Sequence, residues 1–249
     1  MTIYITPFED IKEVDFEKNE QESPLLNYEL PRGLFQQENT LGQFLLNSEM
    51  QHWEQTLENR LFSTRSKFAY AMFYYYKGIP DEKWFLSPGL QGQSVQYFPY
   101  FTNEHFSNQY NFIFFADGFF LKAFTVFETI GQILFRYYNL EYNEEDYSDQ
   151  ISYNNAVFKL FNVDRPLQKK LSKIKKSDDF QNGVKIRNAI THSHPPYEIS
   201  SGVKITTSGG SFGIGEYTTS KELKEAMIGI LRSIKATLDV LGKHFETKN

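Results

Sequence analysis

An arginine, an asparagine and a histidine lie close together in one short stretch, Arg187-Asn188-Ala189-Ile190-Thr191-His192. A histidine side chain titrates near neutral pH, so it can donate or accept a proton during catalysis. An arginine can hold a phosphate group and stabilise the negative charge that develops on it in a transition state. These residue types therefore indicate acid–base chemistry on a phosphate ester.

The spacing of the three residues sets a geometric condition. The pattern before them predicts a helix that ends at the double proline after His194. Asn188 and His192 are four residues apart, so they share one face of that helix. Arg187 lies about 140° around the axis from His192 on an ideal helix. A long arginine side chain, a loosened last turn or a second subunit must close this gap.

Structural roles for the same residues are the alternatives. His192 can cap the last carbonyl groups of its own helix, and Arg187 can form a salt bridge. His192 and His194 form an H-x-H pair, but the chain has only 5 His and no Cys to complete a metal site. We therefore expect no metal ion and no cofactor.

The hydrophobic pattern predicts an all-α fold, a helical bundle of four to five main helices with a small inserted β-hairpin. The helices are expected at 40–77, 105–140, 152–162 and 165–174, from the cap Ser177 to the prolines at 195 and 196, and at about 219–245. Gly209 and Gly210 predict the hairpin within 203–217. Prolines break residues 1–38, which we interpret as an irregular acidic arm packed on a helical domain at 39–249.

The motif and this layout resemble the HEPN superfamily (higher eukaryotes and prokaryotes nucleotide-binding). Its signature is R-x4–6-H with a polar residue, often Asn, directly after the Arg, which matches Arg187, Asn188 and His192. The likeness in architecture covers 40–245. The resemblance implies a metal-independent endoribonuclease whose two motifs form one composite site in a homodimer. It also implies a toxin–antitoxin or defence setting, with an antitoxin or other protein partner.

The same resemblance implies a role for each site residue. His192 would activate the ribose 2′-hydroxyl or protonate the leaving oxygen, Arg187 would bind the scissile phosphate, and Asn188 would orient one of them. Family members also place an acidic residue on an earlier helix, for which Glu128 is the first choice and Asp117 the second. A HEPN-like domain that binds nucleotide, RNA or a protein without catalysis is the alternative function.

The charge distribution indicates where RNA would bind. The chain has a net charge of −5, which argues against general binding of polyanions. Residues 165–187 nevertheless hold 8 basic and 2 acidic residues. The expected RNA-binding residues are Lys169, Lys170, Lys173, Lys175, Lys176 and Lys185. A solvated helix and loop without a ligand is the alternative interpretation.

Composition limits the remaining classes of function. The absence of cysteine excludes disulfides and cysteine nucleophiles. No apolar segment reaches the roughly 20 residues of a membrane span, so we expect a cytoplasmic protein without a membrane partner. Aromatic residues make up 17% of the chain. We expect them to fill a bulky core and to line part of a dimer interface.

Overall fold

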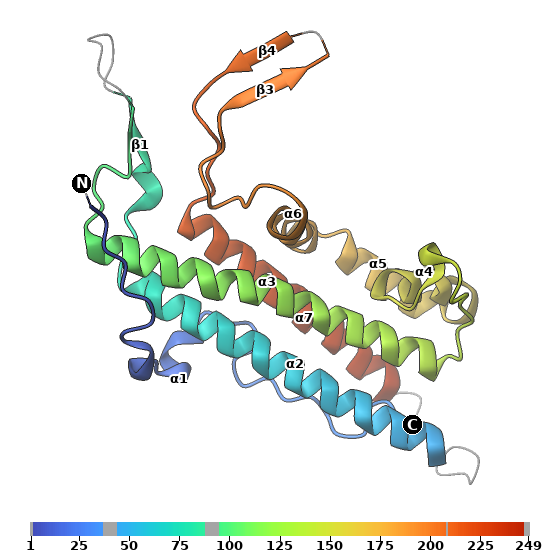
Figure 1. Ribbon diagram of the computed structural model, residues 1–249. Helices are drawn as coiled ribbons and strands as arrows, with labels where there is room; N and C mark the ends of the chain where they lie inside the picture. The colour runs from blue at the N-terminus through green and yellow to red at the C-terminus, as the bar shows by residue number, and fades with distance from the viewer. Residues whose placement is uncertain (1, 37–43, 88–94, 208, 247–249) are drawn as a thin grey trace. The chain divides into compact units, whose positions relative to one another are not determined.

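The computed structural model describes residues 2–36, 44–87, 95–207 and 209–246. Its helices are α1 (Phe16–Asn19), α2 (Phe44–Tyr76), α3 (Asn103–Tyr137), α4 (Tyr153–Val163), α5 (Arg165–Lys175), α6 (Asp178–His192) and α7 (Ser220–Glu246) (Figure 1). Its strands are β1 (Phe85–Leu86), β2 (Gln96–Tyr97), β3 (Val203–Thr206) and β4 (Gly209–Phe212). The predicted all-α class, the six predicted helices and the hairpin are confirmed. Residues 40–43 of the first predicted helix lie outside the described residues.

The chain forms two compact units, each assembled from three separate stretches of sequence. Unit 1 comprises Met1–Glu22, Ser66–Phe120 and Asn182–Met227, and unit 2 comprises Ser23–Arg65, Leu121–Gln181 and Ile228–Asn249. The N-terminal 36 residues contribute to both units. The division of the chain into an arm and a helical domain at residue 38 stays a prediction.

In unit 1 an extended N-terminal segment is bound to one face of α3. The backbone N–H groups of Tyr4, Thr6 and Phe8 donate to side-chain oxygens of Asn103, Ser107 and Asn111, at 3.3, 3.0 and 3.2 Å. The three acceptors recur every four residues, so they form one row along the helix. Side chains of α3 therefore accept the hydrogen bonds of these alternate backbone N–H groups, in place of a neighbouring β-strand.

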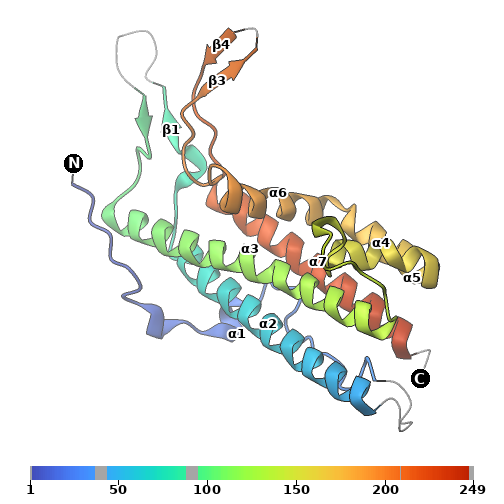
Figure 2. The ribbon, with the colours of Figure 1, turned by 45° about the vertical axis from the view of Figure 1, so that its right-hand side comes forward.

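Two short antiparallel ribbons project from the helices of unit 1 in the same direction (Figures 1 and 2). In one of them β3 pairs with β4, with Val203 opposite Phe212 and Thr206 opposite Gly209. In the other β1 pairs with β2. The β1–β2 ribbon is absent from the elements predicted above, because strands of two residues leave no periodic signal in a sequence.

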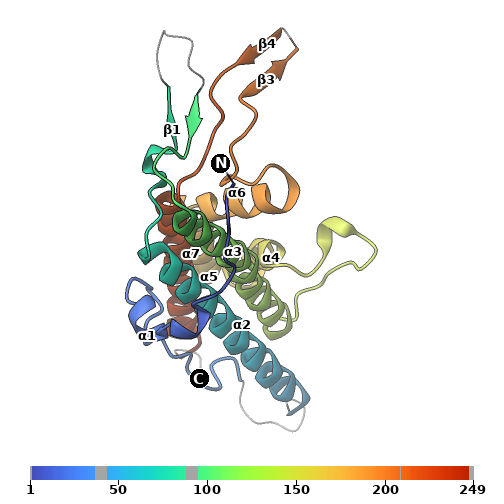
Figure 3. The same cartoon turned by 60° about the vertical axis from the view of Figure 1, so that its left-hand side comes forward.

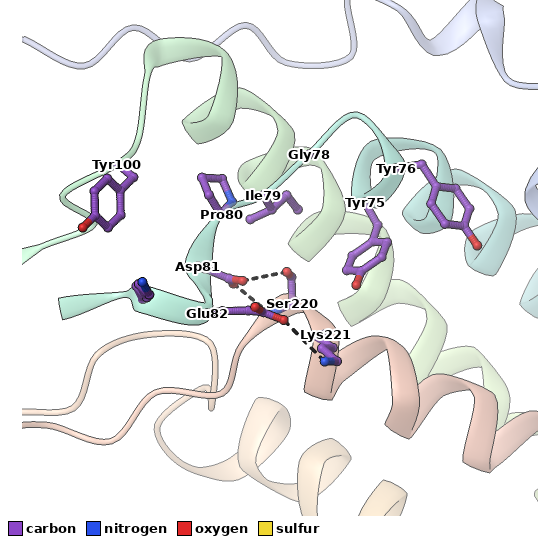
Figure 4. A pocket seen from close by; sticks show the side chains of 11 residues that line it. Tyr75, Tyr76, Gly78, Ile79, Pro80, Asp81, Glu82, Tyr100, Ser220 and Lys221 are labelled. Atoms are coloured by element: carbon purple, nitrogen blue, oxygen red, sulfur yellow. Dashed lines mark hydrogen bonds and ion pairs between the residues drawn. The ribbon is translucent and has the colours of Figure 1, made fainter.

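The start of α7 is held by a buried carboxylate in unit 1. The Asp81 side chain is 1% exposed and accepts hydrogen bonds from the N–H (2.7 Å) and O–H (2.8 Å) of Ser220 and from the O–H of Tyr217 (2.8 Å). Burial raises the pKa of Asp81, although these three hydrogen bonds act in the opposite direction. A pocket of about 560 Å³ opens here, and Figure 4 shows Asp81 and Ser220 pointing toward one another at its edge.

In unit 2 the helix α4 lies beside the C-terminal half of α3 (Figure 3). The ring of Phe127 on α3 lies 5.2 Å from the ring of Tyr153 and 5.0 Å from that of Phe180, centroid to centroid. Gly131 lets the backbones of α3 and α4 approach closely. A Cβ atom at this position would lie 2.6 Å from the backbone nitrogen of Tyr153.

We expect the substitution Gly131→Ala to lower the free energy of unfolding by about 1–3 kcal/mol, because the added methyl group forces α3 and α4 apart. Gly242→Ala on α7 is the matched control, since nothing lies within 4 Å of its added Cβ. The control should raise stability by roughly 0.5–1 kcal/mol through helix propensity. Urea unfolding followed by circular dichroism measures both, and an undiminished stability of Gly131→Ala would contradict the close approach.

Candidate functional site

The helix that carries the motif, α6, is anchored at its beginning within unit 2. The hydroxyl of Ser177 accepts the N–H of Phe180 at 3.3 Å, which confirms the predicted cap. Arg232 on α7 donates two hydrogen bonds to the carboxylate of Asp179, at 2.8 and 2.9 Å. The guanidinium holds the pKa of Asp179 below its usual range. The first turn of α6 is therefore fixed by both polar and aromatic contacts.

The three motif residues occupy the last turns of α6, in unit 1. The side chains of Asn188 and His192 are exposed, and Arg187 is partly buried. Among the described residues, neither Asn188 nor His192 has a side-chain hydrogen bond or ion pair. The imidazole of His192 is thus accessible to a ligand, on the same helix face as Asn188.

Among the described residues, Thr191 and Ser193, rather than the side chain of His192, donate to carbonyl oxygens near the end of the helix. The hydroxyl of Thr191 donates to the carbonyl of Arg187 at 2.8 Å. The backbone N–H of Ser193 donates to the carbonyl of Ala189 at 3.1 Å, so the helical pattern continues through His192. His192 therefore does not act as the cap that the alternative interpretation required.

The segment after α6 is held by contacts within unit 1. The hydroxyl of Tyr197 donates to Oδ2 of Asp117 on α3 at 2.5 Å. The N–H of Thr218, just before α7, donates to the carbonyl of Pro196 at 2.7 Å. The chain that leaves the motif is therefore tied to α3 and to the residues just before α7.

The two candidate acids have different surroundings. Asp117 is partly buried, and its Oδ1 is buried without a hydrogen-bond partner among the described residues. Burial raises the pKa of Asp117 against the effect of the Tyr197 hydrogen bond, and the charge of Glu198 raises it further. Glu128 belongs to unit 2, where its Oε2 accepts the N–H of Tyr153 at the start of α4, at 3.1 Å. Sequence reasoning missed the Asp117–Tyr197 contact, which joins residues 80 positions apart.

Most of the predicted RNA-binding lysines are accessible. Exposed side chains are those of Lys169, Lys170, Lys173, Lys176 and Lys185. Lys175 differs, because it is partly buried and its Nζ lies 6.0 Å from the ring centroid of Tyr153. Burial lowers the pKa of Lys175, and the carboxylate of Glu128 opposes that shift. Lys175 therefore contributes to the interior of unit 2 more than to its surface.

In the described part of the chain, no three His, Asp or Glu side chains gather closely enough to hold a metal ion. None of the helices in that part combines the length and the apolar character that a bilayer span requires.

We expect wild-type protein to lose stability relative to the Asp117→Asn variant as the pH rises. A raised pKa means that the folded state binds the proton of Asp117 more tightly than the unfolded state does. Its stabilising contribution is therefore complete below the unfolded-state pKa and is lost as the pH rises through the raised one. Urea unfolding of both proteins between about pH 4 and pH 7 measures this difference. If the free energies of unfolding of the two proteins changed in parallel with pH, or differed with the opposite sign, the raised pKa of Asp117 would be contradicted.

Comparison with known proteins gives one match. The family model described as Cthe2314-like HEPN matches residues 53–242, a segment that runs from α2 into α7 and includes all of α6. Searches of curated proteins and of solved structures gave no significant match. The family model covers well over half of the chain, and the resemblance predicted from the motif is confirmed. The chain belongs to the HEPN superfamily.

Proposed function

We propose that this protein is a metal-independent endoribonuclease that acts as a homodimer through Arg187, Asn188 and His192. The observation that carries the proposal is the accessible imidazole of His192. It is exposed on the same helix face as Asn188, and it follows the partly buried Arg187 by five residues. Membership of the HEPN superfamily supports it, because the family resemblance associates this motif with RNA cleavage. The proposal includes a toxin–antitoxin or defence setting, in which an antitoxin or other protein partner restrains the activity.

The chemistry follows from the residue types. The neutral imidazole of His192 accepts the proton of a ribose 2′-hydroxyl, and the oxygen attacks the adjacent phosphorus. The bond from phosphorus to the 5′-oxygen breaks, which leaves a 2′,3′-cyclic phosphate on one fragment and a 5′-hydroxyl on the other. The imidazolium of His192 that results returns this proton, through a water molecule, to the leaving 5′-oxygen. The imidazole gains one proton and loses one, so the step balances and each site needs a single histidine.

Arg187 would stabilise the charge on the phosphate. Its guanidinium carries a positive charge and can donate two parallel hydrogen bonds to phosphate oxygens. Because α6 remains helical through His192, the arginine and histidine of one chain keep their angular separation. A site that combines Arg187 of one chain with His192 of the other meets this constraint.

The acidic member of the site is proposed as Glu128, with Asp117 as the second choice. Each carboxylate has one oxygen that binds a group of its own unit, the Tyr153 amide for Glu128 and the Tyr197 hydroxyl for Asp117. The other oxygen of each accepts no hydrogen bond from a described residue. Glu128 is exposed and therefore keeps an oxygen for orienting an imidazole or a ribose hydroxyl, whereas the free oxygen of Asp117 is buried and would have to become accessible first.

We expect wild-type protein to cleave total cellular RNA in the presence of EDTA. His192→Ala and Arg187→Ala should each reduce the rate by about 100-fold or more, as is usual for the loss of an acid–base group or a phosphate-binding charge. His194→Ala is the matched control, since His194 is also exposed but lies outside the motif. It should cleave like the wild type.

Gel electrophoresis of the RNA, with circular dichroism to verify folding, measures these rates. Cleavage that survives both motif substitutions would contradict the site. A wild type that cleaves no RNA would contradict the ribonuclease and favour a HEPN domain that binds nucleotide, RNA or protein.

We expect a mixture of the two inactive variants to regain activity if the site is shared between subunits. In a mixed dimer, the Arg187→Ala chain supplies His192 and the His192→Ala chain supplies Arg187, which restores one of two sites. After subunit exchange, about one quarter of wild-type activity should return, because about half of the dimers are mixed. A mixture that stays inactive although native mass spectrometry detects mixed dimers would contradict the shared site.

A further inference from the structure

Two large aromatic side chains stand exposed on α4 in unit 2. Phe158 is 77% exposed and Phe161 is 50% exposed. They are three residues apart and therefore share one face of the helix, which lies beside the buried face formed by Tyr153, Val157 and Leu160. Neither ring is needed to fill the core of the unit, since the buried face already does so.

The basic residues of α5 continue from these rings. The guanidinium carbon of Arg165 lies 4.9 Å from the ring centroid of Phe161. Lys169 and Lys173 follow Arg165 at intervals of four residues, so all three share a face of α5. Residues 165–176 contain 6 basic and no acidic residues. Among the described residues, none forms an ion pair with Arg165, Lys169 or Lys173.

This combination of groups selects a particular kind of ligand. Neighbouring cations that lack acidic partners attract a polyanion and release its counterions when it binds. Stacking of exposed phenylalanine rings on planar, apolar faces is favourable for binding. Single-stranded RNA offers both phosphates and unpaired bases, whereas a duplex keeps the faces of its bases inside the stack.

We propose that the α4–α5 surface, formed by Phe158, Phe161, Arg165, Lys169 and Lys173, is a docking platform for single-stranded RNA. Unpaired bases stack on the two phenylalanine rings, and the three basic side chains bind the flanking phosphates. The inference rests on the proposed function and deepens it, because it assigns unpaired segments as the class of RNA that the enzyme takes. The accessible lysines of α5 that belong to this surface, Lys169 and Lys173, would thereby bind RNA phosphates.

Binding is measured by fluorescence anisotropy on full-length protein carrying His192→Ala, which keeps the RNA intact. The probes are an unstructured RNA of about 12 nucleotides, within the range of single-strand site sizes, and a duplex of equal length. Adding Phe158→Ala or Phe161→Ala should weaken binding of the single strand about 5-fold or more and leave duplex binding unchanged. Lys169→Ala should lower the slope of log affinity against log salt concentration by about 0.7.

Phe212→Ala is the matched control, because Phe212 on β4 is 89% exposed and lies outside the platform. It should bind like the parent. Single-strand binding that is unchanged by both phenylalanine substitutions, or an equal loss for duplex and single strand, would overturn the proposal. Binding to vesicles of phosphatidylserine but not to RNA would also overturn it and would assign the surface to an anionic membrane. This assay measures binding and not cleavage. A wild type that cleaves no RNA would therefore overturn the proposed ribonuclease activity without overturning the proposed binding of RNA to the α4–α5 surface.

Discussion

The geometry of the α-helix is the constraint on which the site depends. Residues five positions apart point about 140° from one another around the axis, and Arg187 and His192 stand in this relation on α6. The hydrogen bond from Ser193 to Ala189 keeps the last turn intact, so a loosened turn does not relieve the offset. The length of the Arg187 side chain and a second subunit remain as the means of bringing both groups to one phosphate. Our proposal relies on the second subunit.

Buried and partly buried carboxylates hold loop segments and a helix start in place. Glu54 on α2 accepts the N–H groups of Gly33 (3.1 Å) and Phe35 (2.9 Å), Asp81 holds the start of α7, and Asp117 binds the segment after the motif. Burial raises the pKa of each of these three groups. Each contact therefore carries a desolvation cost, which hydrogen bonds to groups far away in the sequence offset. Through Glu54 on α2 and Asp117 on α3, the long helices thus fix loops as well as contributing to the core.

The sequence was sufficient to predict the long helices and the hairpin, because both leave a periodic or turn-specific signal. It also located the motif, because Arg187, Asn188 and His192 lie within two turns of the same helix, α6. The contacts of Asp81 and Asp117 were not predictable, because they join residues 139 and 80 positions away. The exposure of Phe158 and Phe161 was equally hidden. An aromatic residue in a helical pattern suggests the core, and only the packing of α4 shows which face is buried.

The helix α6 and its neighbours connect the features that the proposed function uses. Unit 2 anchors the beginning of the motif helix and presents a basic, aromatic surface on α4 and α5. Unit 1 contains the motif and holds the segment that follows it. We propose that the surface binds unpaired RNA and that the motif cleaves it.

The chemical nature of the RNA ends tests the central claim most directly. Mass spectrometry of the fragments produced in EDTA should find 2′,3′-cyclic phosphates and 5′-hydroxyl groups. An otherwise identical RNA with a 2′-deoxyribose at the cleaved position should stay intact, because the attacking oxygen is absent. Cleavage of the deoxy substrate at that position, or fragments with 3′-hydroxyl and 5′-phosphate ends, would contradict catalysis by His192 acting on the ribose hydroxyl.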